Sequence, residues 1–260
     1  MYLELAVQAA QEAGRALRGR FRQPHEIILK GVRDITTEAD LEAEALAIGV
    51  IRAGCPGALF VSEESNQTAL QSATQPVWYI DPLDGTTNYA RGLGGWCVSV
   101  AAALAGQVVC GAVFDPVTGE LFTASRGEGA WLNGAPLHVS GQSELAESII
   151  LMDWPREQTW RKQGLRYLDR LAPRILVPRS VGSAALALCY VAAGWAEGYF
   201  QYTLKSWDVA AASLILAEAG ARTTDMRGRP AQLDTPDWLA SNGHIHEALL
   251  ALGPLSPDAP

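Results

Sequence analysis

The residues best placed to do chemistry are two aspartates followed by Gly-Thr-Thr in the stretch VWYIDPLDGTT. An apolar strand would deliver Asp81 at its end, and Gly85 permits a sharp turn directly after Asp84. If a helix begins near Thr86, its free N–H groups form an anion site beside these carboxylates and the Leu83 carbonyl. Carboxylates beside an anion site indicate a bound cation, although Asp-Gly alone is also typical of a hairpin turn.

Acidic residues occur at two further element boundaries. Glu63 ends the apolar stretch FVSEES, and Asp208 begins the apolar stretch WDVAAASLILAEAG. Taken separately, they are compatible with a solvated turn and a helix N-cap. Together with Asp81 and Asp84 they would bring four negative charges into one site, where unpaired carboxylates repel one another. Mg²⁺ prefers such oxygen ligands, and two such ions would suit in-line phosphoryl displacement.

The composition limits the other classes of function. The chain has 260 residues, 48% of them hydrophobic, and a net charge of −8, which argues against a nucleic-acid partner. The longest apolar run, CVSVAAALAGQVVCGAVF, is interrupted by glycines and predicts paired strands, so we expect no membrane partner. No secretory signal is apparent, and four scattered cysteines favour reduced thiols in a cytoplasmic protein: Cys55, Cys97, Cys110 and Cys189.

The elements that must position the acids divide into two halves. In the half 1–140, helical spacing predicts a helix over 3–21, and Thr37 with Asp40 resembles a capping box that begins a helix running toward Gly54. The runs EIIL, ALFV and VWYI predict strands, and hairpin patterns follow them. This half is predicted to be α+β and to carry the metal-binding loops.

The half 141–260 alternates strands with helices. Strands are predicted at SIILM, RILV and WLAS, and helices at GSAALALCYVAAG and WDVAAASLILAEAG. This half is predicted to be α/β, with the substrate-side helices and the second-metal aspartate. No low-complexity linker separates the halves, so we expect an extensive interface between them.

Several motifs, in order along nearly the whole chain, resemble the inositol monophosphatase family. SEES is similar to its G-E-E-S element, DPLDGTTNY to its D-P-[IL]-D-G-T-x-N-[FY] element, and WDVAAASLILAEAGA to its W-D-x-A-A…E-A-G element. The resemblance implies a layered αβαβα sandwich of the inositol monophosphatase and fructose-1,6-bisphosphatase type. It also implies lithium-sensitive, Mg²⁺-dependent phosphomonoester hydrolysis with two or three ions per site, frequently in a homodimer.

The resemblance also assigns roles to individual residues. The metal ligands would be Glu63, Asp81, the Leu83 carbonyl, Asp84 and Asp208. Asp40, Thr86 and Glu63 would act in catalysis, the first two by positioning the attacking water. The N–H groups of Gly85, Thr86 and Thr87 would hold the phosphate, and Lys30 falls in the family's mobile loop.

The substrate side departs from the family pattern. Gly182, Ser183 and Ala184 match the substrate-contacting turn, but Gln201 stands where inositol-preferring members place an acid, with Lys205 nearby. Gln201 either faces a more anionic substrate or faces solvent, and Arg179 either reaches a substrate anion or pairs with surface acids. Inositol monophosphate is the expected substrate. Fructose 1,6-bisphosphate, histidinol phosphate and 3′-phosphoadenosine 5′-phosphate are the alternatives.

Two other classes of protein share features with this sequence. A haloacid-dehalogenase-type phosphatase needs D-x-D-G-T, but Leu83 occupies the position of its second acid, which favours direct water attack. A non-catalytic regulatory protein on the same fold is the rival from another class. His244 and His246 form H-x-H without other expected ligands, and their setting predicts a helix start.

Overall fold

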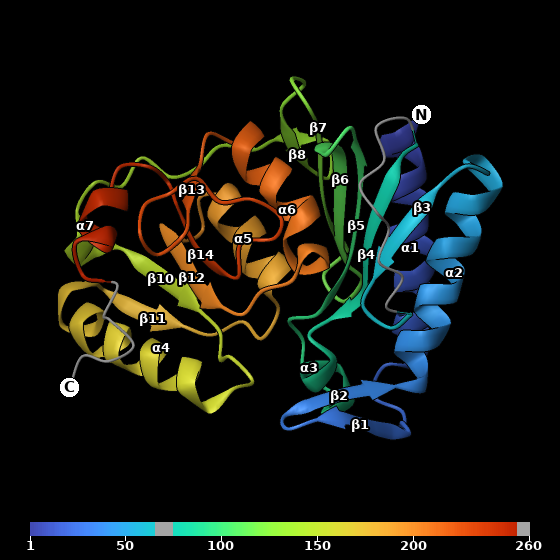
Figure 1. The fold of residues 1–260 in the computed structure, drawn as a ribbon, viewed down its shortest axis with the longest axis horizontal. Helices are drawn as coiled ribbons and strands as arrows, with labels where there is room; N and C mark the ends of the chain where they lie inside the picture. The colour runs from blue at the N-terminus through green and yellow to red at the C-terminus, as the bar shows by residue number, and fades with distance from the viewer. Residues whose placement is uncertain (66–74, 254–260) are drawn as a thin grey trace.

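The computed structural model describes residues 1–65 and 75–253, which form five layers (Figure 1). From one side to the other these are a helix pair, a seven-stranded sheet, a second helix pair, a five-stranded sheet and an outer helix layer. The predicted αβαβα sandwich is confirmed. In the described part of the chain, no helix is long and apolar enough to cross a membrane.

The first layer consists of α1 (Tyr2–Arg20) and α2 (Glu38–Gly54), which pack together on the large sheet. Alanines at helical spacing in α1 are fully buried, so the two helices and the sheet approach closely. The Thr37 side chain caps α2, and the Asp40 carboxylate accepts a hydrogen bond from the Thr37 N–H. These two contacts form the predicted capping box. This cap fixes where α2 begins and therefore where Asp40 lies.

The large sheet has the order β3-β4-β5-β6-β7-β8-β9, with β3 and β4 parallel and the other neighbours antiparallel. Buried apolar side chains occupy both of its faces, because a helix pair covers each one. Its strands are β3 (Leu59–Ser62), β4 (Val77–Asp84), β5 (Cys97–Leu104), β6 (Gln107–Asp115), β7 (Glu120–Ser125), β8 (Ala130–Leu132) and β9 (Ala135–Pro136).

The central layer consists of α5 (Ala184–Ala192) and α6 (Ser206–Glu218), which are apolar on nearly every side. This composition suits helices that are enclosed between two sheets. α6 approaches the large sheet closely at Gly111 of β6, where an added Cβ would lie 2.8 Å from the Ala211 Cα. The second half of the chain therefore packs directly on the sheet of the first half.

The five-stranded sheet has the order β11-β10-β12-β14-β13. β10 is parallel to both of its neighbours, while β14 runs antiparallel to β12 and β13. α4 (Gln158–Leu171) and α7 (His246–Leu250) cover its outer face. The strands are β10 (Ile149–Met152), β11 (Val177–Arg179), β12 (Gly198–Tyr202), β13 (Arg222–Thr224) and β14 (Asp237–Ser241).

Two predicted strands take a different place from the simplest expectation. The strand predicted at RILV begins later, at Val177, because Pro173 lies in the short 3-10 helix η2 (Ala172–Arg174). Another short 3-10 helix, η1 (Leu145–Glu147), precedes β10. The strand predicted at EIIL is β1 (Ile27–Gly31), which pairs with β2 (Asp34–Thr37) in a two-stranded sheet and is exposed along its length. This hairpin lies beside α3 (Thr86–Ala90), outside the large sheet.

His246 begins α7, as its setting predicted, and is fully buried. Its Nδ1 lies 2.8 Å from the Ser241 hydroxyl and its Nε2 lies 2.9 Å from that of Thr224. Because the Thr224 hydroxyl proton is donated to the Asp225 carbonyl, Nε2 is the donor of the pair and Nδ1 accepts from Ser241. A neutral imidazole is thereby satisfied at both nitrogens, which explains this histidine without a metal.

Acid should destabilise the protein through this side chain. Burial lowers the pKa of His246 from 6.5 to about 4, so the unfolded chain binds a proton below pH 6.5 that the folded chain excludes. Between pH 7 and pH 5 we expect wild type to lose about 2 kcal/mol of its stability advantage over His246→Gln in urea unfolding. Exposed His138→Gln is the control, and its difference from wild type should stay constant over the same interval.

Candidate active site

The end of β4 forms the floor of the site. Its pairing with β5 is irregular between Asp81 and Asp84, and both residues line the same cavity. Asp81 is 1% exposed, and its Oδ1 accepts a hydrogen bond from the Leu83 N–H at 3.0 Å. Gly85 then adopts a φ of +101°, which favours glycine, and α3 begins at Thr86. The local geometry is the strand, turn and helix that the sequence predicted.

Asp84 joins the two halves of the chain. Its Oδ2 accepts hydrogen bonds from the Ser183 hydroxyl and from the Ala185 N–H, both at 2.7 Å. The same Ser183 side chain accepts from Leu186 N and caps α5. The N-terminus of α5 is therefore fixed against the end of β4.

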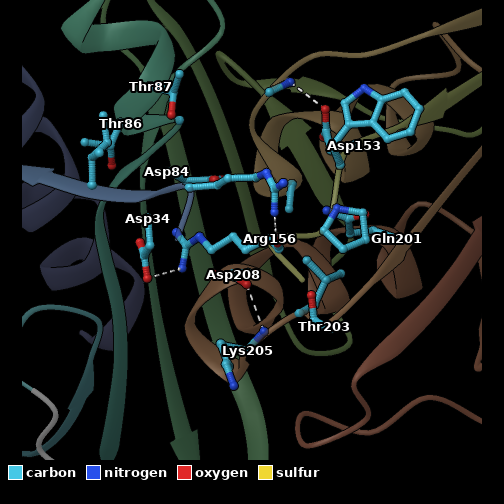
Figure 2. Close-up of a pocket in the computed structure, with 18 of the residues that line it drawn as sticks. Asp34, Asp84, Thr86, Thr87, Asp153, Arg156, Gln201, Thr203, Lys205 and Asp208 are labelled. Atoms are coloured by element: carbon cyan, nitrogen blue, oxygen red, sulfur yellow. Dashed lines mark hydrogen bonds and ion pairs between the residues drawn. The ribbon is translucent and has the colours of Figure 1, made fainter. Parts of the chain in front are cut away.

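Glu63 and Asp208 complete the set of acids. Glu63 directly follows β3, and Asp208 lies in the first turn of α6, where its Oδ2 accepts from the Lys205 N–H at 2.8 Å. Both line one cavity of about 800 Å³ together with Asp81 and Asp84. Figure 2 shows Asp84 and Asp208 on facing elements of this cavity. The fold thus brings together all four acids that the sequence singled out.

The acids repel one another in this setting. Burial raises the pKa of Asp81 well above its usual range, and three neighbouring carboxylates raise it further. Burial likewise raises the pKa of Asp208 well above its usual range and that of Asp84 to about 6. A divalent cation would relieve this repulsion, and buried oxygen donors are the type that Mg²⁺ takes, so these residues fit the metal.

Two basic side chains of the protein form ion pairs with acids at the site. Lys30 contacts Glu63 at 3.0 Å and Glu64 at 2.8 Å, and Arg156 lies 3.7 Å from Glu63. Among the residues that the structure describes, no three Asp, Glu, His or Cys side chains form a ready coordination group. If Glu63 were a metal ligand, it would exchange these ion pairs for the metal.

Asp40 and Thr86 form the predicted pair at the edge of the acids. The Thr86 hydroxyl lies 3.0 Å from Asp40 Oδ1 and 3.0 Å from the Leu83 carbonyl. Asp40 is fully buried, and burial raises its pKa to about 7. A carboxylate with such a pKa can accept a proton near neutrality, which suits a group that assists a water through Thr86.

Comparison with known proteins adds independent evidence to this geometry. A sequence model of the inositol monophosphatase family matches residues 2–254. The chain belongs to the inositol monophosphatase family. It is 37% identical over 253 residues to Nus factor SuhB of Pasteurella multocida, covering 95% of this chain and 94% of that protein. It is 36% identical over 251 residues to an inositol-1-monophosphatase of Mesorhizobium japonicum, with coverage of 95% and 94%.

Solved structures agree with the family assignment. The extragenic suppressor protein suhB of Bartonella henselae superposes with a TM-score of 0.91 at 33% identity, covering 96% of each chain. The inositol monophosphatase of Anabaena gives a TM-score of 0.84 at 33% identity and covers 96% of this chain and 94% of that one. Membership of the inositol monophosphatase family supports a phosphatase.

The residues predicted from the family to contact the phosphate and the substrate fall into two groups. Those that line the cavity are Gly85, Thr86, Thr87, Gly182, Ala184 and Gln201. Gln201 is only 8% exposed, so it does not face solvent, and its Oε1 accepts from Tyr202 N. Ser183 uses its hydroxyl on Asp84 instead. Arg179 is exposed, and the contact that it makes is with the Pro178 carbonyl.

Asp153 is a member of the site that the family motifs did not indicate. It directly follows β10, is 8% exposed, and its Oδ1 accepts from Gly182 N at 2.7 Å and Ser180 Oγ at 2.8 Å. Burial raises its pKa to about 6. Asp153 therefore orders the turn that precedes α5. An acid at the end of an apolar strand, the pattern that revealed Asp81, was the available signal.

Proposed function

We propose that this chain is a Mg²⁺-dependent phosphomonoesterase that directs a water molecule at a small phosphorylated metabolite. The observation that carries the proposal is the convergence of four acids from three separate segments on one cavity in a member of the inositol monophosphatase family. The groups that would hold the metal are Glu63, Asp81, the Leu83 carbonyl, Asp84 and Asp208. Mg²⁺ at this site would supply positive charge for the phosphate oxygens and lower the pKa of a water.

The protein's own groups would orient the reaction. Thr86 lies within hydrogen-bonding distance of Asp40, so its hydroxyl can hold the attacking water while Asp40 accepts a proton. Gly85, Thr86 and Thr87 line the same cavity, and their backbone N–H groups would hold the phosphate. Gln201 would contact the leaving group from β12. The attack needs no covalent bond between an aspartate and the phosphate.

Inositol monophosphate is the first substrate to test, because it is the compound for which the family is named. The same chemistry could act on fructose 1,6-bisphosphate, histidinol phosphate or 3′-phosphoadenosine 5′-phosphate. We further propose a cytoplasmic homodimer without a membrane partner. The net charge of −8 favours a protein that does not bind nucleic acid directly.

A regulatory role is the second candidate, because several similar proteins are named Nus factor SuhB. Such a role could accompany hydrolysis, since every metal-side position of this chain carries a suitable oxygen. It could also replace hydrolysis on the same fold. Catalysis and regulation are distinguished by whether the purified chain turns over a substrate.

The assay is phosphate release by the purified chain after EDTA treatment, with and without added Mg²⁺. We expect turnover of at least one of the four compounds only when Mg²⁺ is restored, and inhibition by Li⁺. Equal release in EDTA would contradict the metal dependence. No release from any of the four in Mg²⁺ would leave the regulatory role as the better proposal.

A further inference from the structure

The cavity has a second chemical region at its mouth, beside the acids. Its cationic lining residues are Arg33, Arg156, Arg161 and Lys205. Figure 2 shows Arg156 extended across the cavity toward Asp34, with Lys205 at the start of α6 below it. At about 800 Å³, the cavity has room for more than the single phosphate that the acids would engage. The lining therefore carries four cationic side chains in addition to its acids, among which Asp34 and Glu157 lie beside the arginines in the chain.

Most of these cations lack a carboxylate partner. Arg33 donates from Nη1 to the Arg156 carbonyl at 3.0 Å, and Arg161 donates from Nε to the Pro155 carbonyl at 2.7 Å. Within residues 1–65 and 75–253, no carboxylate forms an ion pair with Arg33, Arg161 or Lys205. Their remaining N–H groups are available to an anion.

Arg156 holds the central place in this group. Its Nη1 pairs with Asp34 at 3.1 Å, its Nη2 lies 3.7 Å from Glu63, and its side chain is 53% exposed. If Glu63 binds a metal, as the proposed function requires, the contact between Glu63 and Arg156 Nη2 is lost. The Nη2 side of the guanidinium is then free. An arginine edge with two parallel N–H groups matches a phosphate in a bidentate arrangement.

The Gln201 side chain on the opposite wall offers a hydrogen-bond donor to the substrate. Gln201 uses its Oε1 on the Tyr202 N–H, and in the described part of the chain its Nε2 donates no hydrogen bond. The side chain therefore offers a donor, whereas an acid would accept from substrate hydroxyls. A donor suits the oxygens of an anion. The wall and the mouth consequently complement the same kind of substrate.

We propose that Arg156, assisted by Arg33 and Lys205, binds a second phosphate of the substrate and makes small bisphosphorylated metabolites the preferred class. This inference rests on the proposed function and narrows its substrate. The scissile phosphate lies at the acids, and the second phosphate lies at the mouth. A monophosphate with an uncharged leaving group binds without using Arg156.

The test compares fructose 1,6-bisphosphate with inositol 1-phosphate in wild type, Arg156→Gln and Arg156→Lys. We expect Arg156→Gln to lower kcat/KM for the bisphosphate about 10- to 100-fold, mainly through KM, and to change the monophosphate less than about threefold. Arg156→Lys should recover part of the loss, because lysine keeps the positive charge but lacks the bidentate N–H groups of the guanidinium. Arg222→Gln, on β13 beside Glu247, is the matched control and should leave both substrates unchanged.

A binding measurement separates this inference from the proposed function. Calorimetric titration of both compounds in the presence of Ca²⁺ should show weaker binding of the bisphosphate to Arg156→Gln than to wild type. Equal binding by the two proteins, or equal losses for both compounds, would overturn the role of Arg156. Absence of phosphate release from both compounds in wild type with Mg²⁺ would count against the phosphatase, while selective loss of bisphosphate binding would still support the subsite.

Discussion

Asp81→Asn should lose at least about a thousandfold in phosphate release, the equivalent of roughly 4 kcal/mol of barrier. Asp81 is 1% exposed and lies among the other acids at the end of β4. Asparagine keeps the size of the side chain and the oxygen that accepts from Leu83 N, but it removes the charge. The comparison is the initial rate against Mg²⁺ concentration, and we expect saturation to require more Mg²⁺ than in wild type.

The unfolding temperature in EDTA separates this effect from misfolding. It should not fall in Asp81→Asn, because the substitution removes a buried charge that neighbouring carboxylates repel. Asp115→Asn is the matched control, since Asp115 is also 1% exposed but lies on β6 and does not line the cavity. Full turnover by Asp81→Asn at ordinary Mg²⁺ concentrations would rule out a metal role for this carboxylate.

Gly111→Val should destabilise the protein by about 3 kcal/mol and reduce activity at the same time. A Cβ at position 111 would lie 2.8 Å from the Ala211 Cα and 2.9 Å from its carbonyl oxygen, both of them backbone atoms of α6. To make room, α6 must move away from the large sheet, and it carries Asp208 in its first turn. Valine is otherwise favourable in a strand, so a loss of stability would be caused by the steric clash with the Ala211 backbone.

Urea unfolding and the Mg²⁺ dependence of the rate are the two measurements for this variant. Gly19→Ala is the control, because nothing lies within 4 Å of the added Cβ on the exposed side of α1. That substitution should stabilise the helix by about 0.5–1 kcal/mol and leave activity unchanged. If Gly111→Val unfolds at the same urea concentration as wild type, the close packing of α6 on β6 does not limit the fold.

Local chain chemistry made much of the site predictable. The turn after Asp84 needs a residue that tolerates a φ of +101°, and Gly85 supplies it, so the sequence indicated the strand, turn and helix at this point. The cap formed by Thr37 and Asp40 was also predictable from the sequence, because its hydrogen bonds join residues no more than three positions apart. In each case the residues that determine the geometry are neighbours in the chain.

The family motifs assigned metal-binding roles to acids that lie far apart in the chain. The residue types suggested that Glu63 and Asp208 belong with Asp81, and the motifs strengthened that grouping, although 145 positions separate Glu63 from Asp208. The structure brings these acids to one cavity. The roles assigned to them as metal ligands remain predictions for the Mg²⁺ experiments above.

Contacts between distant segments were decided by the tertiary structure. The sequence placed Ser183 on the substrate, but the packing of α5 directs its hydroxyl to Asp84, across 99 positions. It gave no reason to expect that Arg156 would meet Asp34 of the β1–β2 hairpin, because 122 positions separate the two residues in the chain. The first strand predicted from apolar residues pairs with β2 in an exposed two-stranded hairpin and is not part of the large sheet.

By itself, the sequence determined the caps, the turn at Gly85, the buried helices and the family to which the chain belongs. Only the tertiary structure decided which cations share the cavity with the acids. It also decided that Asp153 accepts from the Gly182 N–H and that Gln201 Oε1 accepts from the Tyr202 N–H. The physical reason is the range of the interactions. Hydrogen bonds between near neighbours follow from residue types, whereas contacts across the cavity depend on how two sheets and the helices between them pack.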